Sequence, residues 1–222
     1  MIDRLVKRKN FRRLSVLSSA LLVAVFILAM AAQAEAAYYV QAKQGTGYWY
    51  GAYSSNYVMS NPTVNPGSWK VNAVFCETLN RTAWVECGWW KDGDSPYACE
   101  HFGARYNTSE GYHEDIYGSA TPGTNHTYGV RWMADTQLWR YYVDGVAKPD
   151  RANNAITSAV IATNAETHNS NDSNYGHWWS LQYWDKDAAQ WKLWTNLVQN
   201  RDDDPNYKLT KTSNTECYSE HI

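Results

Sequence analysis

The stretch HTYGVRWMADTQLWRYYVDGV, residues 126–146, is the part of the chain that decides the fold class. Large apolar residues fill every second position on both sides of a turn at residues 134–136: Tyr128, Val130, Trp132, Trp139, Tyr141 and Val143. Alternation of this kind is typical of half-buried β-strands, and Asp144-Gly145 is a tight-turn signal. The stretch therefore predicts an antiparallel hairpin with strands at residues 127–134 and 138–143.

Segments of the same character recur along the rest of the chain, between turn signals such as Asn65-Pro66-Gly67 and Thr121-Pro122-Gly123. They cover residues 68–77, 82–90, 97–106, 155–163, 177–185 and 190–195. Neither a long amphipathic helix nor a repeat of fixed period is evident. Many short strands separated by turns predict an all-β, single-domain antiparallel β-sandwich or barrel.

The first 34 residues have the order of a secretory signal peptide: a basic start, a long apolar run and small residues at Ala32-Gln33-Ala34. Cleavage is expected after Ala34, with Ala36 and Ala37 as neighbouring alternatives, and a retained membrane anchor is the other interpretation. The leader resembles bacterial ones, and the mature protein is expected to be secreted and free of the membrane. We assign residues 1–34 to the leader, 35–65 to an N-terminal strand or loop arm, and 66–222 to the β-sandwich.

The charge of the mature chain argues against one class of partner. The leader holds six of the 20 Lys and Arg residues and one of the 22 Asp and Glu residues, which leaves a net charge of −7. A nucleic-acid-binding protein would carry a basic face. We therefore do not expect a nucleic-acid ligand. The charge itself gives no positive clue to the partner, which is expected on other grounds to be a polypeptide or a polysaccharide.

All four cysteines lie in the mature part of the chain: Cys76, Cys87, Cys99 and Cys217. An even number of cysteines in an exported protein predicts two disulfides. The favoured pairing is Cys87 with Cys99 and Cys76 with Cys217, and free buried thiols are the alternative.

The segment WVECGWW, residues 84–90, places one carboxylate in a run that otherwise resembles a buried strand. Strand alternation puts Glu86 and Gly88 on one face and Cys87 on the other. A charge in apolar surroundings is costly unless it is paired or its pKa moves. Glu86 is therefore either a groove-lining acid, with space over Gly88 for a ligand or a second backbone, or an ordinary exposed sheet residue.

Two family resemblances follow from these segments. The hairpin at residues 126–146 resembles the strand pair of concanavalin A-like sandwich domains, including laminarinase-type glycosidases, which implies a jelly-roll fold. Retaining glycosidases of that group carry Glu-x-Asp-x-x-Glu on one strand, with the two carboxyl groups close together. This sequence lacks that motif, and Glu110, Glu114 and Asp115 are spaced differently.

The order of several segments resembles that of β-sandwich glutamic peptidases, the eqolisin and neprosin groups. Glu86-Cys87-Gly88 matches their Gln/Glu-x-Gly segment, and Ala165-Glu166-Thr167 loosely matches the later strand with the second catalytic residue. The resemblance covers about residues 68–195. It implies catalytic roles for Glu86 and Glu166.

On this resemblance Glu166 is the general base and Glu86 stabilises the oxyanion and orients the substrate. Two carboxyls that face one groove repel each other when both are ionised, so the pair is expected to work at acidic pH with one shared proton. Gln182 could supply an amide to the same groove. The implied function is that of an acid-active glutamic endopeptidase without a cofactor.

A non-catalytic secreted module that binds carbohydrate or a cell surface is the alternative function. Exposed aromatic rings on a sandwich face can stack on sugar rings. The candidates are Trp90, Trp179 and Trp184. A peptidase needs the two glutamates within reach of one groove, whereas a sugar binder needs several exposed rings and no acid pair.

Other catalytic and metal sites have little support in the sequence. No Gly-x-Ser-x-Gly segment is present. The six histidines show no His-x-x-x-His spacing, and the sequence predicts no metal site.

Overall fold

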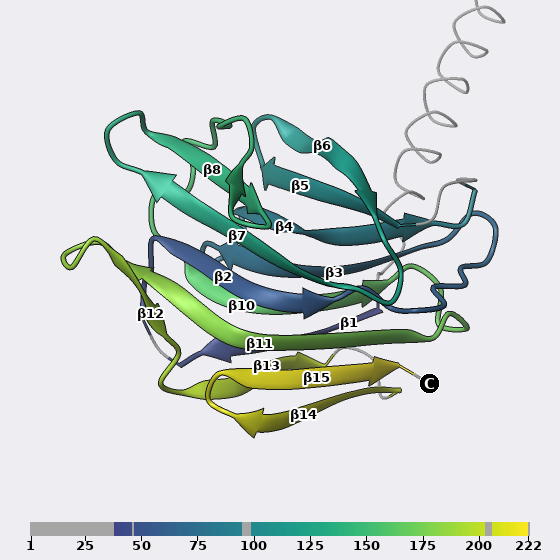
Figure 1. Ribbon diagram of the computed structural model, residues 1–222. Helices are drawn as coiled ribbons and strands as arrows, with labels where there is room; N and C mark the ends of the chain where they lie inside the picture. Colours follow the sequence, from purple (N-terminus) through teal and green to yellow (C-terminus); the bar gives the residue numbers. More distant parts are fainter. Residues whose placement is uncertain (1–37, 46, 95–98, 203–205, 222) are drawn as a thin grey trace, which may run out of the picture. The chain divides into compact units, whose positions relative to one another are not determined.

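The computed structural model describes residues 38–45, 47–94, 99–202 and 206–221, and this part of the chain forms two antiparallel β-sheets packed face to face (Figure 1). Its strands confirm the predicted all-β sandwich, and it contains no helix long and apolar enough to cross a bilayer. The expected leader lies outside the described residues.

The first sheet has seven strands. In spatial order they are β13 (Leu197–Asp202), β1 (Tyr38–Gln44), β10 (Val160–Thr167), β3 (Trp69–Glu77), β4 (Ala83–Asp92), β5 (Cys99–Asn107) and β6 (Gly111–Ala120). The neighbours β3, β4, β5 and β6 are consecutive in the chain, whereas β10 and β1 join them from distant segments.

The second sheet has eight strands. In spatial order they are β14 (Tyr207–Ser213), β15 (Glu216–His221), β11 (Asn174–Asp185), β2 (Gly51–Tyr57), β7 (Asn125–Met133), β8 (Leu138–Val143) and β9 (Val146–Ala147), with β12 (Gln190–Leu193) paired to β11. The expected arm at residues 35–65 supplies β1 to one sheet and β2 to the other, so the sandwich starts well before residue 66.

The hairpin that decided the fold class is present, with strands close to the expected ranges. Tyr128 pairs with Val143 and Val130 with Tyr141, and these four side chains point into the core. Asp144 (φ +52°) and Gly145 (φ +74°) are both left-handed, which is the two-residue turn that matches the twist of β-hairpins.

The core between the sheets is built largely from aromatic side chains. Trp89 comes from the seven-stranded sheet, and Trp139 and Trp178 come from the eight-stranded one; all three are fully buried. Trp89 donates from Nε1 to the carbonyl of Tyr57 on the opposite sheet over 3.0 Å. Burial of each large aromatic contributes about 1.5–3 kcal/mol, so these contacts hold the two layers together.

The predicted disulfides are absent: all four cysteines are free, buried thiols on the inner faces of the sheets. Cys87 lies opposite Gly103 on β5, four residues from Cys99. Four residues of strand span about 13 Å, whereas bridged cysteines have Cα atoms within about 7 Å. Cys76 and Cys217 lie on opposite sheets, where Cys217 bonds the Thr163 hydroxyl instead. The core therefore replaces the expected cross-links.

Candidate active site

Glu86 lies on β4 and points to the outer face of the seven-stranded sheet, while Val85 and Cys87 point into the core. Apolar side chains of the same face surround it, in a cluster formed by Val71, Ala73, Phe102 and Ala104 with Trp69, Trp84 and Trp90. Only 6% of Glu86 is exposed, and its Oε2 has no hydrogen-bond partner among the described residues. It is therefore not the exposed sheet residue that the sequence also allowed.

The surroundings of Glu86 favour its protonated form. Burial raises its pKa well above the ordinary value, and the charges of Glu166 and Glu114 raise it further. A protonated carboxyl can donate a hydrogen bond, which is the role an amide would fill at this position.

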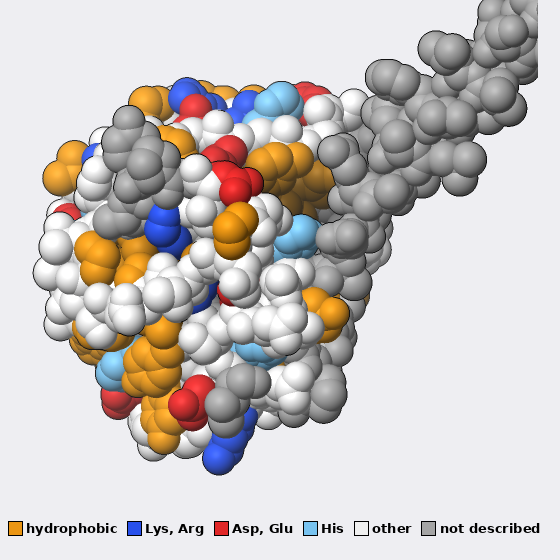
Figure 2. Space-filling model, turned by 90° about the vertical axis from the view of Figure 1, so that its right-hand side faces the viewer, with side chains coloured by type: hydrophobic (Ala, Val, Ile, Leu, Met, Phe, Trp, Pro, Cys, Tyr) orange, Lys and Arg blue, Asp and Glu red, His pale blue; other side chains and the backbone are white. Residues whose placement is uncertain are grey.

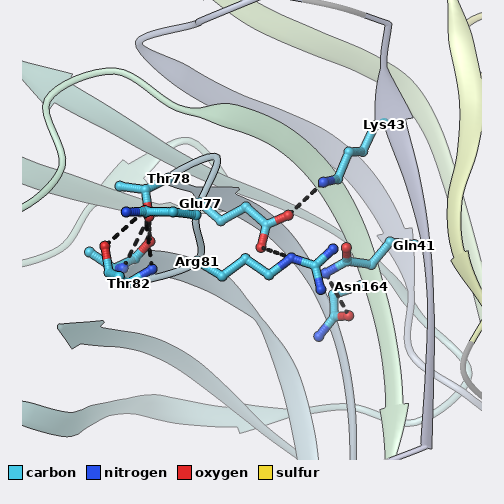
Figure 3. A network of polar contacts seen from close by, with 9 residues as sticks. Gln41, Lys43, Glu77, Thr78, Arg81, Thr82 and Asn164 are labelled. Atoms are coloured by element: carbon cyan, nitrogen blue, oxygen red, sulfur yellow. Dashed lines mark hydrogen bonds and ion pairs between the residues drawn. The ribbon is translucent and has the colours of Figure 1, made fainter. Parts of the chain in front are cut away.

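Glu166 lies on β10 and faces the same side of the sheet. Its Oε2 accepts a hydrogen bond from Asn164 Nδ2 over 2.9 Å. Gln41 donates in turn to Asn164 Oδ1 over 3.4 Å, as Figure 3 shows. Burial raises the pKa of Glu166 to about 7, and the Asn164 bond opposes part of that shift. Glu166 can therefore exchange a proton near neutral pH.

The register fixes how the two glutamates lie relative to each other. Glu166 is opposite Val71 on β3, and Glu86 is opposite Phe75 on the same strand. One strand, β3, lies between β10 and β4, so the two residues are about 10 Å apart across the sheet, and the offset of four residues places them about 13 Å apart along it. No hydrogen bond joins the two side chains, both of which are described, but the charge of Glu166 acts on Glu86. Any joint action of the two carboxyls therefore needs a substrate between them.

The small residues between the glutamates have a structural role. Ala73 and Gly88 lie opposite each other in the row between Glu86 and Glu166. A Cβ on Gly88 would come within 2.1 Å of the Asn72 carbonyl oxygen. The space at Gly88 is thus taken by the backbone of β3 and is not open to a ligand at that point.

Two further residues of this face were not anticipated from the sequence as part of the site. Tyr112 and Glu114 lie on β6, and the Tyr112 hydroxyl donates to Glu114 Oε2 over 2.5 Å. Glu114 lies in the same row as Glu86, because both residues pair with Ala104 on β5. The alternation of Tyr112, Glu114 and Ile116 was the available signal, but the charged and glycine-rich segment around it concealed the strand.

The other predicted binding residues divide between the two sheets. Trp90 lies on the outer face in the same row as Glu166, because both residues pair with Val71 on β3. Trp179, Gln182 and Trp184 belong to β11 in the eight-stranded sheet. Gln182 bonds the carbonyl of Ser180. It cannot supply an amide to the glutamate face, because the whole sandwich lies between them.

The fold has close counterparts among solved structures. Scytalido-glutamic peptidase with a peptide-based transition-state analogue matches with a TM-score of 0.60 and 12% identity, over 84% of this chain and 99% of that one. SCP-B, a member of the eqolisin family of peptidases in complex with a tripeptide, matches with a TM-score of 0.58 and 10% identity over the same shares.

The chain has the β-sandwich fold of the glutamic peptidases. A carbohydrate-binding module, CBM66 from Bacillus subtilis, overlaps less, with a TM-score of 0.40 over 59% of this chain and 77% of that one at 9% identity. No protein-family model matches the sequence, and comparison with curated proteins gives no match.

Proposed function

We propose that the protein is a secreted endopeptidase that hydrolyses polypeptides with Glu86 and Glu166. The observation that carries the proposal is that the buried Glu86 and the partly buried Glu166, both with raised pKa values, share one sheet face without a cationic partner among the described residues. Perturbed carboxyls of this kind concentrate at catalytic sites. The likeness in fold to glutamic peptidases is consistent with the proposal.

The two carboxyls have complementary roles in the proposed reaction. The Glu166 carboxylate takes a proton from a water molecule, whose oxygen attacks the peptide carbonyl carbon. Protonated Glu86 donates a hydrogen bond to the carbonyl oxygen as negative charge develops on it. Glu166 then gives its proton to the leaving nitrogen, the C–N bond breaks, and an acid and an amine are released.

The substrate is expected to lie over the outer face of the seven-stranded sheet, between the two glutamates. The partly exposed indole of Trp90 lies on this face. It would favour an apolar side chain next to the cleaved bond.

The pKa values set the expected pH dependence. Glu166 acts as a base only when ionised, and its pKa is about 7. Glu86 is more deeply buried and has two acidic neighbours, so it retains its proton at higher pH. The state with one proton on the pair therefore lies at about pH 7 and above in the free protein, which is higher than the acidic range expected from the sequence.

The test is cleavage of a denatured polypeptide by the purified exported protein between about pH 3 and 9, a range that includes the pKa of Glu166. New chain ends, identified by mass spectrometry, and a rate that rises towards neutral pH would support the proposal. A folded protein that cleaves nothing across this range would contradict it. Sequencing the N-terminus of the exported protein tests secretion, with Glu35 as the expected first residue.

Binding of polysaccharide is the second candidate, favoured by an aromatic group on the outer face of the eight-stranded sheet. Trp184 and Trp191 have ring centroids 5.3 Å apart, and Tyr53 lies 5.4 Å from Trp191. The Arg131 guanidinium stacks 3.7 Å over Trp184. Such rings can stack on sugars.

A pull-down on insoluble polysaccharide tests this candidate. Retention of the wild type and its loss in Trp184→Ala would favour it, whereas equal recovery of the two proteins would exclude Trp184 from binding. The same variant should leave peptide hydrolysis unchanged, because Trp184 is on the other sheet.

A further inference from the structure

Three potential metal ligands from distant parts of the chain meet between the sheets. They are His101 on β5, His126 on β7 and Asp144 in the turn between β8 and β9. One ligand atom from each residue lies within 4.8 Å of the others. His101 is buried, His126 is partly buried and Asp144 is exposed, so an ion could enter from solvent.

His101 is held in an orientation suited to a ligand. Its Nδ1 bonds the Tyr128 hydroxyl over 2.8 Å, which leaves Nε2 as the coordinating nitrogen. A metal-bound histidine almost always has its second ring nitrogen fixed in this way. The ring meets His126 edge-on, with centroids 4.6 Å apart.

The other two ligands are already in contact. Asp144 Oδ2 accepts from His126 Nδ1 over 2.8 Å, and Asp144 Oδ1 accepts from the Thr127 amide over 2.9 Å. The Thr124 hydroxyl bonds His126 Nε2 over 2.9 Å. Ligand atoms around a tetrahedral zinc ion are about 3.3 Å apart. A small outward movement of Asp144 would replace its bond to His126 by coordination.

We propose that His101, His126 and Asp144 bind one Zn²⁺ ion. Two imidazoles and one carboxylate are a donor set that suits zinc and leaves a fourth position for water. His101 belongs to the seven-stranded sheet, and the other two ligands belong to the eight-stranded sheet. The ion would therefore link the two layers of a sandwich that has no disulfide.

This site is separate from the proposed catalytic face. His101 pairs with the inward-facing Trp89, whereas Glu86 points outward from the same strand pair. The expected effect of the metal is on stability and not on the chemistry at Glu166. Neither proposal depends on the other.

The test is calorimetric titration of the chelator-treated protein with zinc chloride. We expect one ion per chain in the wild type and no such binding in His126→Ala. Asp144→Asn keeps a side chain that tolerates the left-handed turn and should weaken binding at least tenfold. His177→Ala is the matched control, because His177 also bonds a carboxylate, Glu216, over 2.9 Å but has no third potential ligand among the described residues.

Two further readouts distinguish coordination from a general effect of the ion. Cobalt(II) should give the intense visible bands of a tetrahedral site with the wild type and His177→Ala, and not with His126→Ala. Zinc should raise the unfolding temperature of the same two proteins only. Equal zinc binding by His126→Ala and the wild type, or no binding by the folded wild type at millimolar zinc, would overturn the proposal.

Discussion

Acidic residues on one sheet face have two very different kinds of surroundings. Glu77, at one end of the face, bonds Lys43 Nζ over 2.6 Å and lies 3.7 Å from Arg81 Nε, as Figure 3 shows. Glu86 and Glu166 have no cationic partner among the described residues. The Glu77 carboxylate is engaged in ion pairs, whereas Glu86 and Glu166 are available to exchange protons.

The largest expected effect is that of Glu166→Gln on hydrolysis. The amide cannot accept a proton from water, so we expect kcat to fall by about a thousandfold or more. The variant should fold normally, because Asn164 can still bond the amide oxygen. Glu77→Gln, measured beside it well below its unfolding temperature, should retain most of the activity. Equal losses of activity in the two variants would show that Glu166 is no more important for hydrolysis than Glu77.

Glu86 gives the next largest effect, and two substitutions separate its roles. Glu86→Ala removes the hydrogen-bond donor to the developing oxyanion and should lower kcat by about 10²–10³-fold. Glu86→Gln keeps a donor of the same length and should lose much less. Rates for both variants that equal the wild type's would show that Glu86 takes no part in the reaction.

Glu77→Gln should cost the most stability. It would leave Lys43, whose side chain is 11% exposed, without its carboxylate. Loss of one member of a buried ion pair costs about 3–5 kcal/mol, which denaturant unfolding would measure. A change below about 1 kcal/mol, the range of surface ion pairs, would show that the pair is not effectively buried.

The Glu77 carboxylate is expected to stabilise the fold, whereas ionisation of Glu166 should destabilise it in a defined pH range. Because its pKa rises from 4.5 to about 7 on folding, the native state binds the proton more tightly than the unfolded chain. The free energy of unfolding should therefore fall as pH rises from about 4.5 to 7, by at most about 3.4 kcal/mol. Glu166→Gln should remove this slope. If the free energy of unfolding of the variant depends on pH as in the wild type, a group other than Glu166 causes that dependence.

Asn164→Ala gives the smallest expected effect. The bond from Asn164 lowers the pKa of Glu166, so its loss should move the rising limb of the pH–rate profile upward by less than about one unit. The maximal rate should change little. A downward shift would show that Asn164 does not stabilise the carboxylate.

The sequence predicts the parts of the fold in which alternation is strong. The hairpin from Thr127 to Val143 and the strands around Glu86 match the structure because one face of each is apolar. The segment that forms β6 was missed because it is an edge strand with mostly exposed side chains. The strands β14 and β15 also carry polar residues that conceal the period of two.

The site was predictable only in part, for a related reason. Alternation placed Glu86 on the outer face, and the resemblance added Glu166. Neither could show that the register offsets them by four residues, since that depends on how β3 pairs with both strands. The grouping of His101 with His126 and Asp144 was likewise hidden, because it arises from contact between the sheets.

The face seen in Figure 2 has hydrophobic side chains in separate groups among polar ones. The four thiols, in contrast, are all buried. Because burial raises the pKa of Cys87, Cys99 and Cys217 to about 12, they should react with alkylating reagents only when the core opens. Cys87 and Cys99 report on the seven-stranded sheet and Cys217 on the eight-stranded one. The chain thus carries its own chemical probes of whether the two layers separate together or one at a time.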